Sequence, residues 1–106
     1  MKVSVIIPVY NQQKFIGRCL RSILHQTMSK FDYEVIVVND ASTDLTSYAL
    51  TQFSNELIVL ENKTNRGLPY SLNRGIQASK GEYIVRLDSD DYVNENYLTF
   101  LYEILV

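Results

Sequence analysis

The sequence predicts an α/β fold, a Rossmann-like, mostly parallel sheet with crossover helices. Four short runs rich in β-branched residues alternate with stretches of helical period, and this alternation is typical of a parallel sheet. The second run is apolar without a break over residues 35–38, as in a strand that is covered on both faces. The predicted strands span residues 3–9, 34–39, 57–60 and 82–87.

The first predicted helix lies between the first two strands, where apolar residues recur every three or four positions. This stripe consists of Phe15, Ile16, Cys19, Leu20, Ile23 and Leu24. Cys19 is therefore expected to be a buried core residue rather than a nucleophile. His25 follows in the last turn, where a positive charge interacts favourably with the helix dipole, and no chemical role is predicted for it.

The second predicted helix begins at Ser42 or Thr43, both favourable N-cap residues, with Asp44 in its first turn. Its inward residues are expected to be Leu45, Tyr48, Ala49 and Phe53.

The third predicted helix opens at Pro69, which suits a first helical turn, and carries Leu72 and Ile76. It is expected to stop before Lys80 and Gly81, which form a predicted left-handed cap.

The fourth predicted helix begins near Asn94 and reaches Val106 without a glycine, proline or polar cap that would end it. Its inward residues are expected to be Tyr97, Leu98, Leu101, Ile104 and Leu105. We therefore expect residues 1–106 to form a single domain that is a fragment of a longer protein. Phe100 and Tyr102 are then partly exposed, and self-association through this helix is a further expectation.

Composition excludes several classes of protein. The formal net charge of −2 gives no basic field of the kind that draws proteins onto nucleic acid. The single cysteine excludes an intramolecular disulfide and fits a reducing, cytoplasmic setting. No apolar stretch approaches the ~18 residues of a membrane span, and the first residues are apolar too briefly for a signal peptide.

Polar side chains follow three of the four predicted strands, and the carboxyl ends of parallel strands meet at one edge of a sheet. The segments are Pro8-Val9-Tyr10-Asn11, Asn39-Asp40-Ala41-Ser42-Thr43-Asp44 and Asp88-Ser89-Asp90-Asp91. Such residues often only cap a helix or shape a turn. The last segment differs, because its three carboxylates repel one another unless a cation or hydrogen-bond donors compensate. Carboxylate oxygens suit Mn²⁺ or Mg²⁺, whose shell a diphosphate can complete.

Glycine-rich phosphate loops of the familiar kinds are absent. The chain has glycines only at positions 17, 67, 75 and 81, and they form neither G-x-G-x-x-G nor G-x-x-x-x-G-K-[ST]. This spacing argues against an NAD-type dehydrogenase and a P-loop nucleotidase. It favours a site at the sheet edge that holds a nucleotide by side chains and a metal ion.

Four blocks of the sequence carry a family-like pattern. They are residues 3–11, residues 38–44, residues 65–67 with 73–76, and residues 80–84 with 88–91. In this order and spacing they resemble the N-terminal part of a family 2 glycosyltransferase, an inverting family with the GT-A fold. The resemblance covers essentially the whole chain and implies a GT-A-like nucleotide-binding half.

The resemblance implies a site for a nucleotide-diphosphate sugar, most simply a UDP-sugar, with Mn²⁺ or Mg²⁺ as cofactor. In this site Tyr10 lies against the base, and Asp40 accepts a hydrogen bond from a ring N–H, which favours uracil. Asp88 faces the ribose or the metal shell, and Asp90 ligates the cation that bridges the phosphates. The implied nucleotide-binding residues are Pro8, Tyr10, Asn11, Asp40, Arg66, Asp88 and Ser89, and the implied metal ligands are Asp90 and Asp88.

The chain departs from the family pattern at Leu72, where the family often has an arginine, so that arginine's contact is not expected here. Arg66 or Arg74 can supply a cation near the base or phosphates, and an ordinary surface position is the alternative for each. Asn73 is expected to tie the preceding loop to the third helix. The direction of Arg86 is not determined by the sequence.

An inverting transfer needs a general base to take the proton of the acceptor hydroxyl. In the family this carboxylate follows the segment that 88–91 resembles, so the base and the acceptor pocket are expected beyond Val106 and no catalytic residue is assigned. The sugar and acceptor stay open. Polysaccharide, lipid-linked glycan and glycoprotein routes all fit, as does a parent protein at the cytoplasmic face of a membrane.

Three other functions compete with donor binding. A nucleotidyltransferase can share this topology, but its glycine-rich, lysine-bearing loop after the first strand is absent. A receiver domain lacks its acid pair at the same place. A non-catalytic module that binds a nucleotide or a protein partner remains an alternative.

Overall fold

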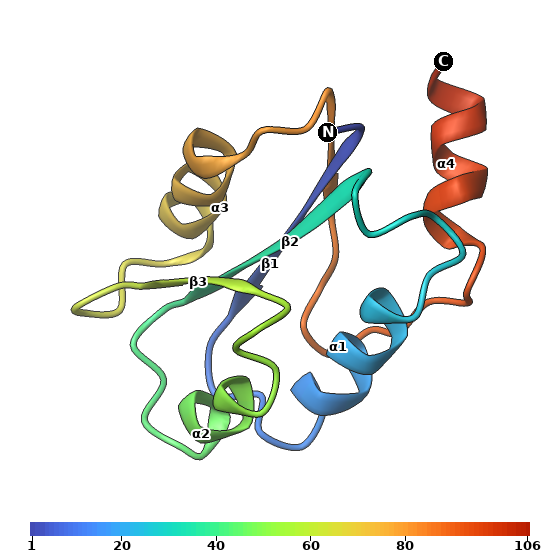
Figure 1. Ribbon diagram of the computed structural model, residues 1–106. Coiled ribbons are helices and arrows are strands. Elements are labelled where there is room, and N and C mark those ends of the chain that lie inside the picture. The colour runs from blue at the N-terminus through green and yellow to red at the C-terminus, as the bar shows by residue number, and fades with distance from the viewer.

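Four parallel strands form the sheet of the computed structural model, which describes residues 1–106 (Figure 1). The strands are β1 (Val3–Val9), β2 (Tyr33–Asn39), β3 (Ile58–Glu61) and β4 (Tyr83–Arg86). Their order is β3-β2-β1-β4, and every neighbouring pair is parallel. The predicted α/β fold with a parallel sheet is therefore confirmed, and each predicted strand differs from the observed one by at most one residue at either end.

Helices cover both faces of this sheet. They are α1 (Ile16–Leu24), α2 (Thr46–Thr51), α3 (Leu68–Ala78) and α4 (Tyr97–Leu105). Helix α3 lies on one face, and α1, α2 and α4 lie on the other (Figure 1). None of the helices has both the length and the apolar character that a membrane span requires.

The larger core lies between the sheet and α1. It contains Cys19, Leu20 and Ile23, which are fully buried against alternate residues of β1 and β2. The expected core position of Cys19 is confirmed. On the opposite face Ile6 and its neighbours on β2 form a smaller cluster under α3. Gly75 permits this packing, because a Cβ atom there would lie 2.5 Å from Cγ2 of Ile6.

Helix α2 begins later than predicted, at Thr46. The predicted cap residues do not cap the helix but bond to the loop after β1. The Ser42 hydroxyl accepts a hydrogen bond from Asn11 N at 3.1 Å, and Thr43 N donates to Asn11 Oδ1 at 2.7 Å. Leu45 lies before the first helical residue, and both Leu45 and Tyr48 are exposed rather than inward, which corrects the prediction. The predicted inward positions of Ala49 and Phe53 are confirmed, and Thr46 and Leu50 are buried as well.

Gly81 does not form the predicted left-handed cap. The only glycine with a positive φ is Gly67, at 90°. Gly81 is required for a different reason: a Cβ atom there would lie 2.4 Å from the backbone nitrogen of Ser4. The glycine thus marks a close approach between the entry to β4 and the start of β1.

Helix α4 is less buried than predicted. Leu98 is fully buried, and Tyr97 and Leu101 pack partly against the core, but Ile104 and Leu105 are exposed. Leu105 still accepts a hydrogen bond at its main-chain oxygen from the Tyr83 hydroxyl at 3.2 Å. The expected exposure of Phe100 is confirmed at 65%. Tyr102 is only partly exposed, and its ring packs edge-on against Tyr83 with centroids 5.9 Å apart.

Candidate functional site

The carboxyl ends of β2, β1 and β4 bring the predicted site residues to one edge of the sheet. The ladder continues past the strands, because Asp40 N donates to Val9 O at 2.9 Å and Leu87 N donates to Ile6 O at 3.0 Å. Asp40 and Asp88 therefore lie on opposite sides of β1, separated by two strand spacings of ~4.8 Å each. They share an edge but do not touch.

Asp40 is held by three hydrogen bonds. Its Oδ1 atom accepts from Asn62 Nδ2 at 2.9 Å and from Arg66 N at 2.7 Å, and its Oδ2 atom accepts from Gly67 N at 3.0 Å. The residue is only 6% exposed. A carboxylate offers about four acceptor positions, so about one remains open.

Burial raises the pKa of Asp40, but hydrogen bonds from Arg66 N, Asn62 and Gly67 N, together with the Arg66 charge, outweigh burial and lower the pKa below its ordinary value. Asp40 is therefore an ionised acceptor at neutral pH.

A small pocket adjoins Asp40. It has a volume of about 110 Å³ and is lined by Pro8, Val9, Tyr10, Asp40, Leu68 and Ser71. Tyr10 is 44% exposed, which leaves its ring available for stacking. The predicted pair Tyr10 and Asp40 thus shares one pocket with Pro8, and an aromatic ring beside an acceptor suits a planar base that carries a donor.

Asn11 ties together the loops that follow β1 and β2. Its side chain accepts from Thr43 N at 2.7 Å and donates to Thr43 Oγ1 at 3.1 Å, and its backbone has a φ of 50°. Ala41, next to Asp40, also has a positive φ of 60°. Asn11 and Ala41 are strained backbone positions of the kind that cluster at functional sites. Asn11 therefore positions the loop beside Asp40, while its predicted contact with a nucleotide stays a prediction.

Three carboxylates lie together after β4. One oxygen each from Asp88, Asp90 and Asp91 lies within 4.8 Å of the others, and all three residues are exposed. This donor set fits a hard divalent cation, since oxygen ligands are preferred and exposure leaves room for water and phosphate. Asp88 Oδ1 also accepts from Arg86 Nε at 3.0 Å and from Nη2 at 2.9 Å. Arg86 thus points to this edge and pairs with Asp88, whereas Asp90 forms no ion pair.

The acidic segment is anchored to the core below it. Ser89 is 6% exposed, and Cys19 Sγ donates to Asp88 O at 3.6 Å. Burial, followed by the charges of Asp91, Asp90 and Asp88, raises the pKa of Cys19 to about 12. The thiol is therefore protonated at neutral pH and cannot serve as a nucleophile.

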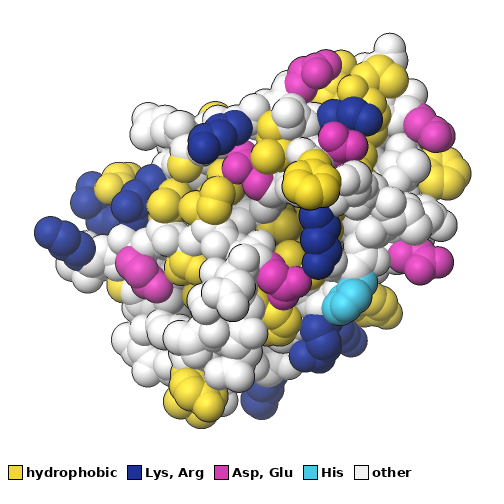
Figure 2. All heavy atoms as spheres, in the orientation of Figure 1, with side chains coloured by type: hydrophobic (Ala, Val, Ile, Leu, Met, Phe, Trp, Pro, Cys, Tyr) yellow, Lys and Arg dark blue, Asp and Glu magenta, His cyan; other side chains and the backbone are white.

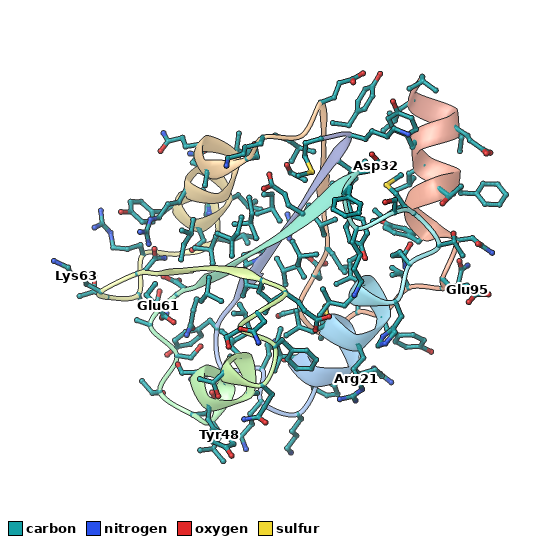
Figure 3. The ribbon with its side chains drawn as sticks, viewed as in Figure 1. Arg21, Asp32, Tyr48, Glu61, Lys63 and Glu95 are labelled. Atoms are coloured by element: carbon teal, nitrogen blue, oxygen red, sulfur yellow. The ribbon has the colours of Figure 1, made fainter.

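Basic side chains gather over the loop after β3, at the left of Figure 2. The pocket there is lined by residues that include Lys63, Arg66 and Arg74. The Arg66 guanidinium stacks on Tyr70 at 4.3 Å, so its main chain rather than its side chain holds Asp40. Lys63 lies at the outer tip of this loop and points away from the molecule (Figure 3).

Arg74, not Asn73, ties this loop to α3, which corrects the prediction. Arg74 Nη1 donates to Glu61 O at 2.7 Å and to Asn62 Oδ1 at 3.0 Å, whereas the Asn73 side chain is exposed.

The sequence prediction missed the residues that hold Asp40. Asn62 and Ser71 are both buried, and Asn62 Nδ2 donates to Ser71 Oγ at 3.0 Å as well as to Asp40. The signal for Asn62 was present, because it directly follows β3 just as Asp40 follows β2. The donors of Arg66 and Gly67 are main-chain N–H groups, so the pattern of side chains in the sequence does not indicate them.

Comparison with known proteins places the chain among glycosyltransferases. Residues 4–105 match the family model described as glycosyl transferase family 2. A poly(ribitol-phosphate) beta-glucosyltransferase from Bacillus spizizenii is 44% identical over 102 residues, which are 92% of this chain and 16% of that protein. The chain thus spans about a sixth of the length of this relative.

Solved structures agree with this result. A crystal structure of Staphylococcus aureus TarS 1-349 in complex with UDP-GlcNAc has a TM-score of 0.92 and 37% identity, covering 99% of this chain and 31% of that one. A mannosyltransferase from Pyrobaculum calidifontis in complex with GDP-Man and Mn²⁺ has a TM-score of 0.81 and 32% identity, over 86% and 28% of the two chains. The family model spans nearly the whole chain, and the chain belongs to glycosyl transferase family 2.

Proposed function

We propose that this chain binds the nucleotide part of a UDP-sugar at the carboxyl edge of its sheet and acts as the donor-binding part of a glycosyltransferase. One observation carries the proposal. Asp40 is an ionised acceptor with an open position in a pocket beside Tyr10, and a carboxylate cluster lies on the other side of β1. Base and diphosphate form opposite ends of a nucleoside diphosphate, which fits two subsites on one edge.

The proposed base is uracil. Its ring N3–H can donate to Asp40, whereas the corresponding nitrogen of cytosine has no hydrogen and faces the carboxylate with a lone pair. Guanine also carries a ring N–H, so the acceptor at Asp40 does not by itself reject it. The related TarS structure that contains UDP-GlcNAc supports this choice, and the mannosyltransferase with GDP-Man makes GDP the informative competitor.

The proposed cofactor is Mn²⁺ or Mg²⁺, with Asp90 as the main protein ligand. Asp88 is shared with Arg86, so it is proposed to face the ribose or to complete the shell with its second oxygen. Such a cation, when bound, stabilises the negative charge that grows on the leaving diphosphate. Ser89 lies between Asp88 and Asp90 in the sequence and is buried.

The residues of this chain bind and orient the donor, and none of them is proposed as the general base. Inverting transfer to an acceptor hydroxyl is part of the proposal for the whole protein. The names of the relatives include a poly(ribitol-phosphate) glucosyltransferase and an N-acetylglucosaminyltransferase, so a hydroxyl of a polysaccharide-like polymer is the proposed acceptor class. The buried free thiol of Cys19 supports a cytoplasmic location as part of the same proposal.

Titration calorimetry with UDP, GDP and CMP, each in Mn²⁺ and in chelator, tests this function. We expect UDP to bind most tightly and to lose affinity in chelator. The Asp90→Asn variant should weaken binding in Mn²⁺ and should not respond to chelator, while Asp32→Asn, on the far end of the sheet, should behave as wild type. Equal affinity for UDP with and without metal refutes the metal subsite, and no binding of any nucleotide refutes the function.

A further inference from the structure

The Asp40 carboxylate is the inner end of a hydrogen-bond chain that begins on α3. Arg74 Nη1 donates to Asn62 Oδ1 at 3.0 Å, and Asn62 Nδ2 donates to Asp40 Oδ1 at 2.9 Å and to Ser71 Oγ at 3.0 Å. Every polar atom of the Asn62 side chain is thereby used. Asn62 is 6% exposed, so water has little access to replace a lost partner.

Arg74 sets the direction of this series of hydrogen bonds. A guanidinium only donates hydrogen bonds, so it requires the amide oxygen of Asn62 on its own side and directs the amide nitrogen toward Asp40. Arg74 is itself fixed, because the same Nη1 atom donates to Glu61 O at 2.7 Å. Its helix is held close to the sheet at the next residue, Gly75.

We propose that Arg74 is a positioning residue for nucleotide recognition: through the Asn62 amide it fixes the orientation of the Asp40 carboxylate, and with it the one open acceptor position in the pocket beside Tyr10. The inference rests on the proposed binding of a uracil nucleotide at Asp40. It assigns Arg74 no contact with the ligand. This distinguishes Arg74 from Arg66, whose main-chain nitrogen bonds Asp40 directly.

Two variants separate hydrogen bonding from packing. Arg74→Met keeps a long side chain but removes every donor, so Asn62 Oδ1 is left without a partner and the amide can turn away from Asp40. Arg74→Lys keeps donor hydrogens on a stem of similar length. Arg21→Met is the matched control, because Arg21 lies on the exposed side of α1, away from the loop after β3 (Figure 3).

The first measurement needs no ligand. We expect NMR titration of the Asp40 side-chain carboxyl carbon to give a higher pKa in Arg74→Met than in wild type, with Arg74→Lys between them and Arg21→Met unchanged. Besides Arg74, the charged and titratable side chains that face this carboxylate are Arg66 and, across the pocket, Tyr10, and none of the variants alters those two. Arg74→Lys keeps the positive charge that Arg74→Met removes, so it also controls for the loss of charge. Thermal melts of each variant record whether the fold is retained.

The second measurement is the ratio of the dissociation constants for CDP and UDP in Mn²⁺. We expect Arg74→Met to reduce this preference for UDP about tenfold, the effect of one misplaced hydrogen bond, and Arg74→Lys to restore most of it. An unchanged Asp40 pKa, an unchanged ratio, or equal losses in Arg74→Met and Arg21→Met overturns the inference. If wild type binds neither nucleotide, the positioning of Asp40 for a base is refuted together with the proposed function. If wild type prefers UDP and only the Arg74 result fails, the function stands without this inference.

Discussion

Replacing Asp40 by asparagine should destabilise the fold as well as weaken nucleotide binding. The carboxylate accepts three hydrogen bonds, two at Oδ1 and one at Oδ2. An asparagine oxygen can keep the two from Asn62 and Arg66. Its amide nitrogen then faces Gly67 N, so two donors oppose each other in a residue that is 6% exposed.

The size of the effect follows from that arrangement. One lost hydrogen bond and one buried donor without a partner cost about 1–3 kcal/mol. For a domain of this size, each kcal/mol corresponds to about 4–8 °C in melting temperature. We therefore expect the free energy of unfolding of Asp40→Asn to be about 1–3 kcal/mol below that of wild type at pH 7.

The difference should shrink in acid. The pKa of Asp40 is lower in the folded state than the ~3.9 of an unfolded chain, so folding favours the ionised form. The stability that this carboxylate contributes is present above about pH 4 and is lost as the pH falls through the lower, folded pKa. Wild type and Asp40→Asn should therefore differ less and less as the pH falls below about 4 and towards the folded pKa of Asp40.

Urea unfolding followed by circular dichroism, at a series of pH values, measures this difference. Asp32→Asn is the matched control, because Asp32 forms only a partly exposed pair with Lys2 at 3.5 Å and should change stability little. The role given to Asp40 is refuted if wild type and Asp40→Asn differ in free energy of unfolding by the same amount at pH 7 and at pH 3, or if they do not differ at pH 7.

Three further predictions test packing, strain and surface. Gly75→Ala should lower the free energy of unfolding by about 1–2 kcal/mol, because the clash with Ile6 outweighs the gain in helix propensity. Gly17→Ala is the control and should be tolerated, because its Cβ meets only the flexible end of an arginine at 3.1 Å, and equal melting temperatures of the two variants would contradict this. Ala41→Gly should raise the free energy of unfolding by about 1 kcal/mol in urea titrations, because it relieves a positive φ, and a loss would count against strain. Sedimentation should show concentration-dependent association that Phe100→Ser reduces, whereas a monomer at all concentrations would contradict the prediction for α4.

The fold was predictable because its signals are local. Period and composition marked every strand, and the unbroken apolar run of residues 35–38 correctly indicated a strand that is covered on both faces. Helix starts were less predictable, because capping depends on partners elsewhere. Ser42 and Thr43 are good caps in isolation, but Asn11, more than thirty positions away, takes their hydrogen bonds.

The candidate site was predictable as a set of strand ends and not as a network. Asp40 and Asp90 each follow an apolar run, so their shared edge follows from topology. The hydrogen bonds from Asn62, Arg66 and Gly67 to Asp40 bridge more than twenty positions, and two of them come from the main chain. The pattern of side chains in the sequence does not predict such main-chain donors. The role of Arg74 was open in the sequence for the same reason.

A crystal structure of this protein with UDP and Mn²⁺, with anomalous scattering recorded for manganese, tests the central claim most directly. We predict a manganese peak at the Asp90 carboxylate, in contact with the diphosphate, and the uracil ring beside Tyr10 with its N3–H on Asp40. A manganese peak away from the cluster of Asp88, Asp90 and Asp91, or a base bound outside the pocket that Asp40 lines, would contradict the account.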